Sequence, residues 1–326
     1  MSPSSRPALS VRRAPHAESA FQADIDACSE VIALGDLQYI AHFTSGVFDF
    51  ATEAGDSLER GPAAEEARYR TGRQLSLSVT ELDMCCQPLD SGPLIRVVVE
   101  GDTGALFHYV KLAGQVFFGM TQEGSGAIRR ADQQIADLAT KAARRLGAAP
   151  MNWGGFGRWE RSDEFGAAYE PAPAQAPPSP RVFAGRRSVP NAVTQACEAA
   201  LSSADIHYVG IYRMGEPEWY ADILEAPELS SFFQRVTPQR RRAGYAELIR
   251  QVYLHSRGLT HLLEIVHSTR LSTLVLDVAR GAIYVMPVGR DDYLVAVTLA
   301  QSQVERAHIR LRALFEQVSQ LGAAGG

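Results

Sequence analysis

The chain has 326 residues, of which 46% are hydrophobic and 21% charged, and its formal net charge is -5. This length suits two domains of about 100–150 residues each, and the composition is that of ordinary globular proteins. The negative charge gives no reason to expect a nucleic-acid partner or an attraction to anionic lipid. No apolar run reaches the roughly 18 residues that a spanning helix needs, so no membrane contact is expected.

The N-terminal part begins with residues 1–16, which are rich in Ser, Pro and Arg and are expected to be disordered. Apolar residues at helical spacing then predict a first helix, and Gly101 and Gly104 frame a hairpin turn between two later strands. The expected elements are a helix over 19–34, strands over 37–43 and 47–52, a helix over 63–86, strands over 94–100, 105–112 and 115–121, and a helix over 126–146.

Residues 148–189 read as a linker, because prolines favour extended backbone and are excluded from helix interiors, and this stretch contains Pro171, Pro173, Pro177, Pro178 and Pro180. The same stretch holds two of the three tryptophans, Trp153 and Trp159. One interpretation is that their rings pack on the first domain and close its edge. The other is that they form an aromatic clamp for a partner protein.

The C-terminal part repeats the order of elements. Thr237 and Pro238 have the residue types of a helix cap and first helical position. The expected elements are a helix over 191–202, strands over 206–213 and 219–224, a short helix over 227–233, a long helix from Pro238 through Val266, strands over 272–278, 282–288 and 293–300, and a closing helix from Val304 to Leu321.

The two parts also match in sequence. The segment that starts at Cys28 returns 169 positions later at Cys197, and the segment that starts at Gly104 returns 177 positions later at Gly281. Each copy therefore reads α-β-β-α-β-β-β-α. Hairpin-length connections require antiparallel pairing, and the helices must cover the sheet. We expect an α+β fold of two tandem domains, residues 17–147 and 190–322, each with a central antiparallel five-stranded sheet.

The four cysteines indicate free thiols. Cys28 and Cys197 occupy matching positions on predicted helices and are expected to be small buried hydrophobes. Cys85 and Cys86 are adjacent, which fits disulfide geometry poorly. Without a disulfide framework or metal-ligand spacing, a reduced, cytoplasmic location is expected.

The strand–turn–strand segment Gly281–Val295, with apolar residues leading into a small turn and then a Leu-Val strand, resembles the core of the roadblock (dynein light chain) family. The first copy is similar, although its turn at 111–114 lacks the acidic pair. The resemblance implies a roadblock-like, profilin-like fold and a noncatalytic role. It further implies pairing through the second helix and its neighbouring strand, as an intrachain pseudo-dimer or a homodimer, and regulation of Ras-like small GTPases.

Signatures of catalysis and of cofactor binding are absent from the sequence. It contains no phosphate-binding P-loop, no His-Glu-x-x-His and no Gly-x-Ser-x-Gly, so no catalytic, cofactor or metal residue is assigned. His42 and His207 lie in or beside strands and are expected on the surface.

Three consecutive arginines, Arg240, Arg241 and Arg242, lie at the start of the long helix predicted from Pro238. They are read either as a solvated helix start or as a docking patch for an acidic partner surface. With Trp153 and Trp159 they are the expected partner-binding residues. The leading functional hypothesis is a noncatalytic scaffold or regulator for a small GTPase or signalling assembly. The alternative is a small-molecule sensor of PAS-like or profilin-like type, which requires a pocket.

Overall fold

The computed structural model describes residues 9–17, 20–55, 61–149, 151–156 and 179–324. Over this range the chain is α+β and forms two compact units. Unit 1 comprises residues 1–80, 95–151 and 258–272, and unit 2 comprises residues 81–94, 152–257 and 273–326.

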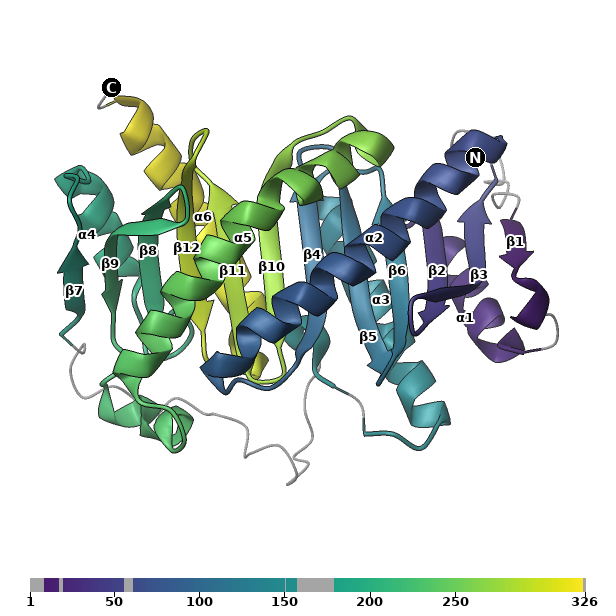
Figure 1. The fold of residues 1–326 in the computed structure, drawn as a ribbon, viewed down its shortest axis with the longest axis horizontal. Helices are drawn as coiled ribbons and strands as arrows, with labels where there is room; N and C mark the ends of the chain where they lie inside the picture. Colours follow the sequence, from purple (N-terminus) through teal and green to yellow (C-terminus); the bar gives the residue numbers. More distant parts are fainter. Residues whose placement is uncertain (1–8, 18–19, 56–60, 150, 157–178, 325–326) are drawn as a thin grey trace, which may run out of the picture. The chain divides into compact units, whose positions relative to one another are not determined.

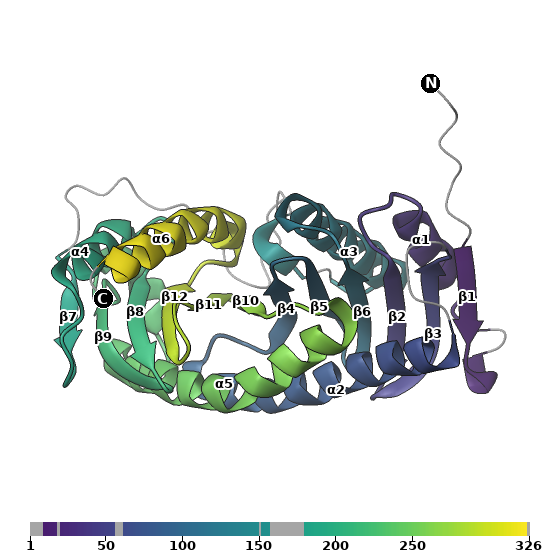
Figure 2. The same cartoon turned by 90° about the horizontal axis from the view of Figure 1, so that it is seen from above.

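The sheet of unit 1 has six strands in the order β1-β3-β2-β6-β5-β4, and the described ladders are antiparallel. Figure 2 shows α1 and α3 on one face of this sheet and α2 on the other. The elements between residues 9 and 145 are β1 (Leu9–Arg13), a short 3-10 turn at Pro15–Ala17, α1 (Gln22–Ile32), β2 (Tyr39–Thr44), β3 (Val47–Ala54), α2 (Pro62–Cys86), a 3-10 turn at Gln87–Leu89, β4 (Leu94–Gly101), β5 (Gly104–Leu112), β6 (Gln115–Thr121) and α3 (Ser125–Arg145).

The sheet of unit 2 has the equivalent order, β7-β9-β8-β12-β11-β10, again in antiparallel ladders. Here α4 and α6 cover one face and α5 the other (Figure 2). The elements between residues 153 and 324 are a 3-10 turn at Trp153–Gly155, β7 (Arg181–Ala184), α4 (Asn191–Ala200), β8 (Tyr208–Arg213), β9 (Glu216–Asp222), a 3-10 helix at Pro227–Phe233, α5 (Pro238–His267), β10 (Leu271–Val278), β11 (Gly281–Pro287), β12 (Asp292–Thr298), a 3-10 turn at Gln301–Gln303 and α6 (Val304–Ala324).

The prediction of five strands per domain is wrong, because each unit adds an edge strand (Figure 1). Strand β1 lies in the segment that was expected to be disordered, and β7 lies in the expected linker. Both strands are largely exposed and have only five and four residues, which is too short for a strand to be recognised with certainty from an apolar pattern in sequence. The other predicted helices and strands are confirmed, with ends that shift by a few residues.

The compact units follow the two repeats except for two short segments. Residues 258–272, from the second repeat, belong to unit 1, where Thr269 Oγ1 accepts a hydrogen bond from the Asp102 amide at 3.0 Å. Residues 81–94, from the first repeat, belong to unit 2, where the Ala279 amide donates to the Pro93 carbonyl at 2.9 Å. Each unit is therefore completed by a segment of the other repeat.

The cores consist of the apolar side chains that the sequence pattern identified. In α1, Ile25, Cys28 and Ile32 are buried at helical spacing, and Cys197 is buried on α4. Burial raises the pKa of the Cys197 thiol to about 12, so this thiol stays protonated at neutral pH. The expectation that Cys28 and Cys197 act as small buried hydrophobes is confirmed.

Candidate functional site

A buried polar network lies on the face of the unit 1 sheet that α1 and α3 cover. Its centre is Asp49 on β3, whose carboxylate accepts hydrogen bonds from His42 Nδ1 at 2.8 Å and from Thr44 Oγ1 at 2.7 Å. The other carboxylate oxygen lies 2.9 Å from Nε2 of His16, a residue of the 3-10 turn before α1. Asp49 and His42 are buried, whereas the His16 side chain is about half exposed. The network thus runs from the sheet interior to the surface.

A buried ionic cluster lies beside α1. Lys111 on β5 is buried, and its Nζ lies 2.7 Å from Oδ2 of Asp24 on α1. Arg145, at the end of α3, is a second partner of the Asp24 carboxylate. A buried ammonium group is tolerated only with such a partner, so Asp24 offsets the desolvation of Lys111.

His42 is enclosed by aromatic rings. The ring centroids of Phe21, Phe50 and Phe117 lie 5.0, 5.4 and 5.3 Å from that of the imidazole. Burial lowers the pKa of His42 below its ordinary value, and the positive charge of Lys111 lowers it further. His42 is therefore neutral at pH 7, with its Nδ1 proton directed to Asp49 and with no hydrogen-bond partner for Nε2 within the described residues.

The backbone is strained at Phe21, beside His42. Phe21, which precedes α1, has φ 62° and ψ 14°, in the left-handed region that a bulky side chain rarely adopts. Such a conformation costs on the order of 1–3 kcal/mol and persists only where the surroundings impose it. The contact of the Phe21 ring with His42 is one interaction that holds it there.

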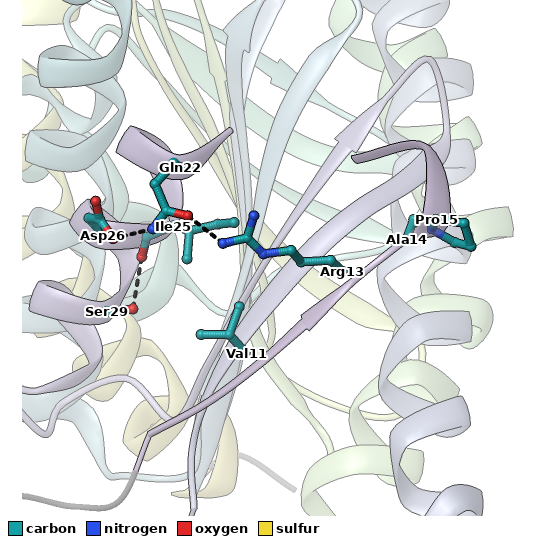
Figure 3. A pocket seen from close by; sticks show the side chains of 8 residues that line it. All are labelled: Val11, Arg13, Ala14, Pro15, Gln22, Ile25, Asp26 and Ser29. Carbon is teal, nitrogen blue, oxygen red and sulfur yellow. Dashed lines mark hydrogen bonds between the residues drawn. The ribbon is translucent and has the colours of Figure 1, made fainter. Parts of the chain in front are cut away.

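Next to this network, an open groove runs between β1 and α1 (Figure 3). Its volume is about 640 Å³. Most of the lining side chains are exposed or half exposed, so the groove is accessible to solvent. Within it Arg13 donates to Gln22, and Gln22 donates to Asp26. The lining residues are Val11, Arg13, Ala14, Pro15, Gln22, Ile25, Asp26 and Ser29.

The network is specific to the first repeat. At the offsets that relate the two copies, His42 corresponds to Ile211 and Lys111 to Val288. Asp24, the partner of Lys111, corresponds to Val193, so the buried ionic cluster has no counterpart. Because unit 2 forms the same strand order without these groups, the fold itself does not require them.

A different ion pair is shared by both repeats. Asp36, before β2, is bound by Arg130 of α3 with an Nε–Oδ1 distance of 2.9 Å. Asp205, at the equivalent position before β8, pairs with Arg306 of α6 at 2.9 Å. This pair fixes the loop after the first helix to the last helix in each unit, and we assign it a structural role.

The three arginines are not an exposed patch, which corrects the sequence-based expectation. Only Arg240 is exposed. Arg241 is buried with its guanidinium 5.0 Å from the centroid of the Phe233 ring. Arg242 is buried and donates to both oxygens of the buried Asp222, each at 2.7 Å. The sequence could not show this because Asp222 lies 20 positions away.

Trp153 is also buried, and it belongs to unit 2. The interpretation that its ring packs on the first domain is therefore wrong. The 3-10 turn that contains it is fixed by two contacts of its neighbours: the Gly154 amide donates to Asp277 Oδ2 at 2.8 Å, and Gln301 Nε2 donates to the Asn152 carbonyl at 2.7 Å. Its burial argues against a clamp at this position. Trp159 lies outside the described residues.

The prediction that His42 and His207 lie on the surface is wrong, because both side chains are buried. His207 Nε2 donates to the Ser203 carbonyl at 3.1 Å, and its Nδ1 accepts from the Leu299 amide at 3.0 Å. A histidine that is satisfied by backbone groups in this way packs like a core residue. A polar residue flanked by apolar ones in a strand does not reveal which face it occupies.

Two further observations bear on the type of site. Within the described residues, no group of three or more His, Cys, Asp or Glu side chains is arranged to hold a metal ion. In the same part of the chain, no helix is both long enough and apolar enough to cross a membrane.

No protein-family model matches the chain, and no curated protein matches its sequence. Inferences on function therefore depend on the residues and the fold.

Proposed function

We propose that this chain is a noncatalytic interaction module that regulates or scaffolds a protein partner. The observation that supports it most is the duplicated architecture: two units with the same strand order, each ending in an exposed edge strand. Exposed edges are common places for protein–protein contacts through main-chain hydrogen bonds. The roadblock resemblance makes a Ras-like small GTPase the specific partner proposed, in a cytoplasmic setting.

An intrachain pseudo-dimer is part of this proposal. Unit 1 contains the last turns of α5, and unit 2 contains the last turns of α2. Such a reciprocal exchange of segments between repeats is what domain swapping produces in two-chain dimers. It supports pairing of the repeats within one polypeptide.

The test is direct binding. The full chain would be titrated against each small GTPase encoded in its source genome, loaded with GDP or with a non-hydrolysable GTP analogue, and GTP turnover would be measured in parallel. We expect micromolar or tighter binding by at least one GTPase, with a preference for one nucleotide state. Neither binding nor a rate change across the complete set would refute the GTPase proposal.

A small-molecule sensor is the second proposal, and the groove between β1 and α1 is the observation that favours it. Its volume of about 640 Å³ falls within the range of about 300–1,000 Å³ that is usual for ligand pockets. Ligand-observed NMR with a metabolite library would test it. A sensor predicts a hit that Gln22→Ala weakens and that exposed Arg240→Ala leaves unchanged. A library without such a hit contradicts this alternative.

A further inference from the structure

The two edge strands have exposed apolar side chains. On β1, Leu9 and Val11 are 42% and 43% exposed, and on β7, Val182 and Phe183 are 49% and 38% exposed. Strand β1 pairs with β3 on one side, and β7 pairs with β9 on one side. No described strand pairs with the other side of either, so every second residue directs its backbone N–H and C=O groups away from the sheet.

The side chains of β1 divide between its two faces. Val11 and Arg13 line the groove beside α1, whereas Arg12 lies 3.3 Å from Glu65 of α2 on the opposite face. Figure 3 places Gln22 beside Arg13, and Ser29 toward Val11. Helix α1 therefore runs back along β1 toward the Leu9 end.

The side chains of β7 divide in the same way. Phe183 stacks on Tyr220, with ring centroids 4.8 Å apart, and Tyr220 stacks on Tyr208. Tyr208 in turn contacts Tyr245 of α5, so Phe183 is on the α5 face. Since side chains alternate along a strand, Val182 is on the α4 face. That face is the one equivalent to the α1 face of β1.

Apart from the arginines of the strands themselves, of which Arg12 pairs with Glu65 and Arg181 with Glu225, the charges beside the two edges have opposite sign. On α1, Asp26 and Glu30 are four residues apart and share one exposed side of the helix. Directly after β7, Arg186 and Arg187 are exposed. None of these four side chains has an ion pair among the described residues.

We propose that β1 of one copy pairs antiparallel with β7 of a second copy of this chain. In this arrangement Val182 of the second copy adds its side chain to the groove that Val11 and Ile25 line. Antiparallel pairing also brings Arg186 and Arg187 of the second copy to the Leu9 end of β1, where α1 presents Glu30 and, one turn earlier, Asp26.

Charge favours this pairing. Two antiparallel β7 strands would bring Arg186 and Arg187 of one copy toward Arg181 of the other, which is repulsive, and two β1 strands would leave these arginines away from the acidic side chains of α1. Only the pairing of β1 with β7 brings the two sets of opposite charges together. The contact between β1 and β7 is heterologous, so each added copy leaves one β1 and one β7 available for further growth. This self-association goes beyond the proposed binding of a partner and does not depend on it.

The experiment measures the mass of the full chain by light scattering over a range of concentrations at low and at high salt. The wild-type mass should rise at least about twofold with concentration at low salt and less at high salt, because the charge contacts are screened. Asp26→Lys with Glu30→Lys, and Arg186→Glu with Arg187→Glu, should each remain monomeric. A mixture of the two double variants should assemble again, because every contact then joins opposite charges.

The control matched to Asp26→Lys with Glu30→Lys is Asp137→Lys with Glu316→Lys, which changes the net charge by the same amount at exposed positions on α3 and α6. It should assemble like the wild type. Circular dichroism and thermal unfolding of every variant would exclude misfolding, and recovery in the mixture is independent evidence of folded subunits. A wild type that is monomeric at all concentrations, assembly that survives Arg186→Glu with Arg187→Glu, or no recovery in the mixture would each overturn the proposal.

Discussion

Asp49 and His42 lie on paired strands, and the 2.8 Å contact from His42 Nδ1 to Asp49 Oδ2 ties the interior of unit 1 to its N-terminal edge. The same carboxylate binds His16, and the Asp49 carbonyl accepts from the Ala14 amide at 2.8 Å. One residue of β3 therefore anchors both a buried imidazole and the turn that follows β1.

Replacing Asp49 should lower the free energy of unfolding. Asp49→Asn keeps the size but removes the charge that three donors share, and hydrogen bonds to charged groups contribute about 1.5–3 kcal/mol each. Because these bonds are not additive, we expect the free energy of unfolding to fall by about 2–4 kcal/mol in urea titrations. His16→Ala, at a half-exposed position, should cost less than about 1 kcal/mol. Equal losses for both variants would contradict a central role for Asp49.

Stability should decrease in mild acid because of buried neutral histidines. Burial lowers the pKa of His108 and of His207 from 6.5 to about 4. A group with a depressed folded-state pKa of this kind takes up protons more readily in the unfolded chain, so its contribution is complete above pH 6.5 and is lost as the pH falls toward 4. The loss approaches about 3 kcal/mol per histidine.

The measurement is the denaturation midpoint between pH 7 and pH 4. His108→Leu, which replaces the buried ring with a non-titrating apolar side chain, should flatten this pH dependence. An unchanged slope in that variant would show that His108 is not protonated on unfolding in the way its burial implies.

Removing the Arg242 side chain should destabilise unit 2 strongly. Arg242→Ala leaves the buried Asp222 carboxylate without its cationic partner, and breaking a buried pair in this way costs about 3–5 kcal/mol. The neighbouring Arg240 is exposed, so Arg240→Ala should change the free energy of unfolding by no more than about 0.5 kcal/mol. Thermal unfolding of both variants distinguishes this structural role from a docking patch, for which the two stabilities would be alike.

The turn that contains Trp153 should not tolerate a side chain at Gly155. Gly155 has φ 68°, and a Cβ atom there would lie 2.8 Å from the Gln301 carbonyl oxygen. Gly147 has nearly the same backbone, φ 70°, but a Cβ atom there would meet nothing within 4 Å beyond its chain neighbours. Gly147→Ala therefore measures backbone strain alone, about 1 kcal/mol. In urea titrations, Gly155→Ala should lower the free energy of unfolding clearly more than Gly147→Ala does. Equal losses would show that the turn shifts to make room for the Cβ atom.

The order of elements was readable from the sequence. Apolar residues at helical spacing identified α1 through Ile25, Cys28 and Ile32, and hairpin turns such as 101–104 required antiparallel pairing. Matching segments at fixed offsets indicated the duplication, which the common strand order of the two units agrees with. These features are encoded by neighbours a few positions apart, so local periodicity is enough to reveal them.

Other features were decided only by tertiary structure. Lys111 and Asp24 are 87 positions apart, and Arg242 and Asp222 are 20 apart, so no local pattern identifies either pair as buried partners. Strands β1 and β7 are short and exposed, and they become strands because a sheet edge provides hydrogen-bond partners for their backbones. The sequence determined the helices and the strands other than β1 and β7, because their signals are local. The two edge strands and the burial of polar groups depend on contacts that exist only once distant segments have packed together.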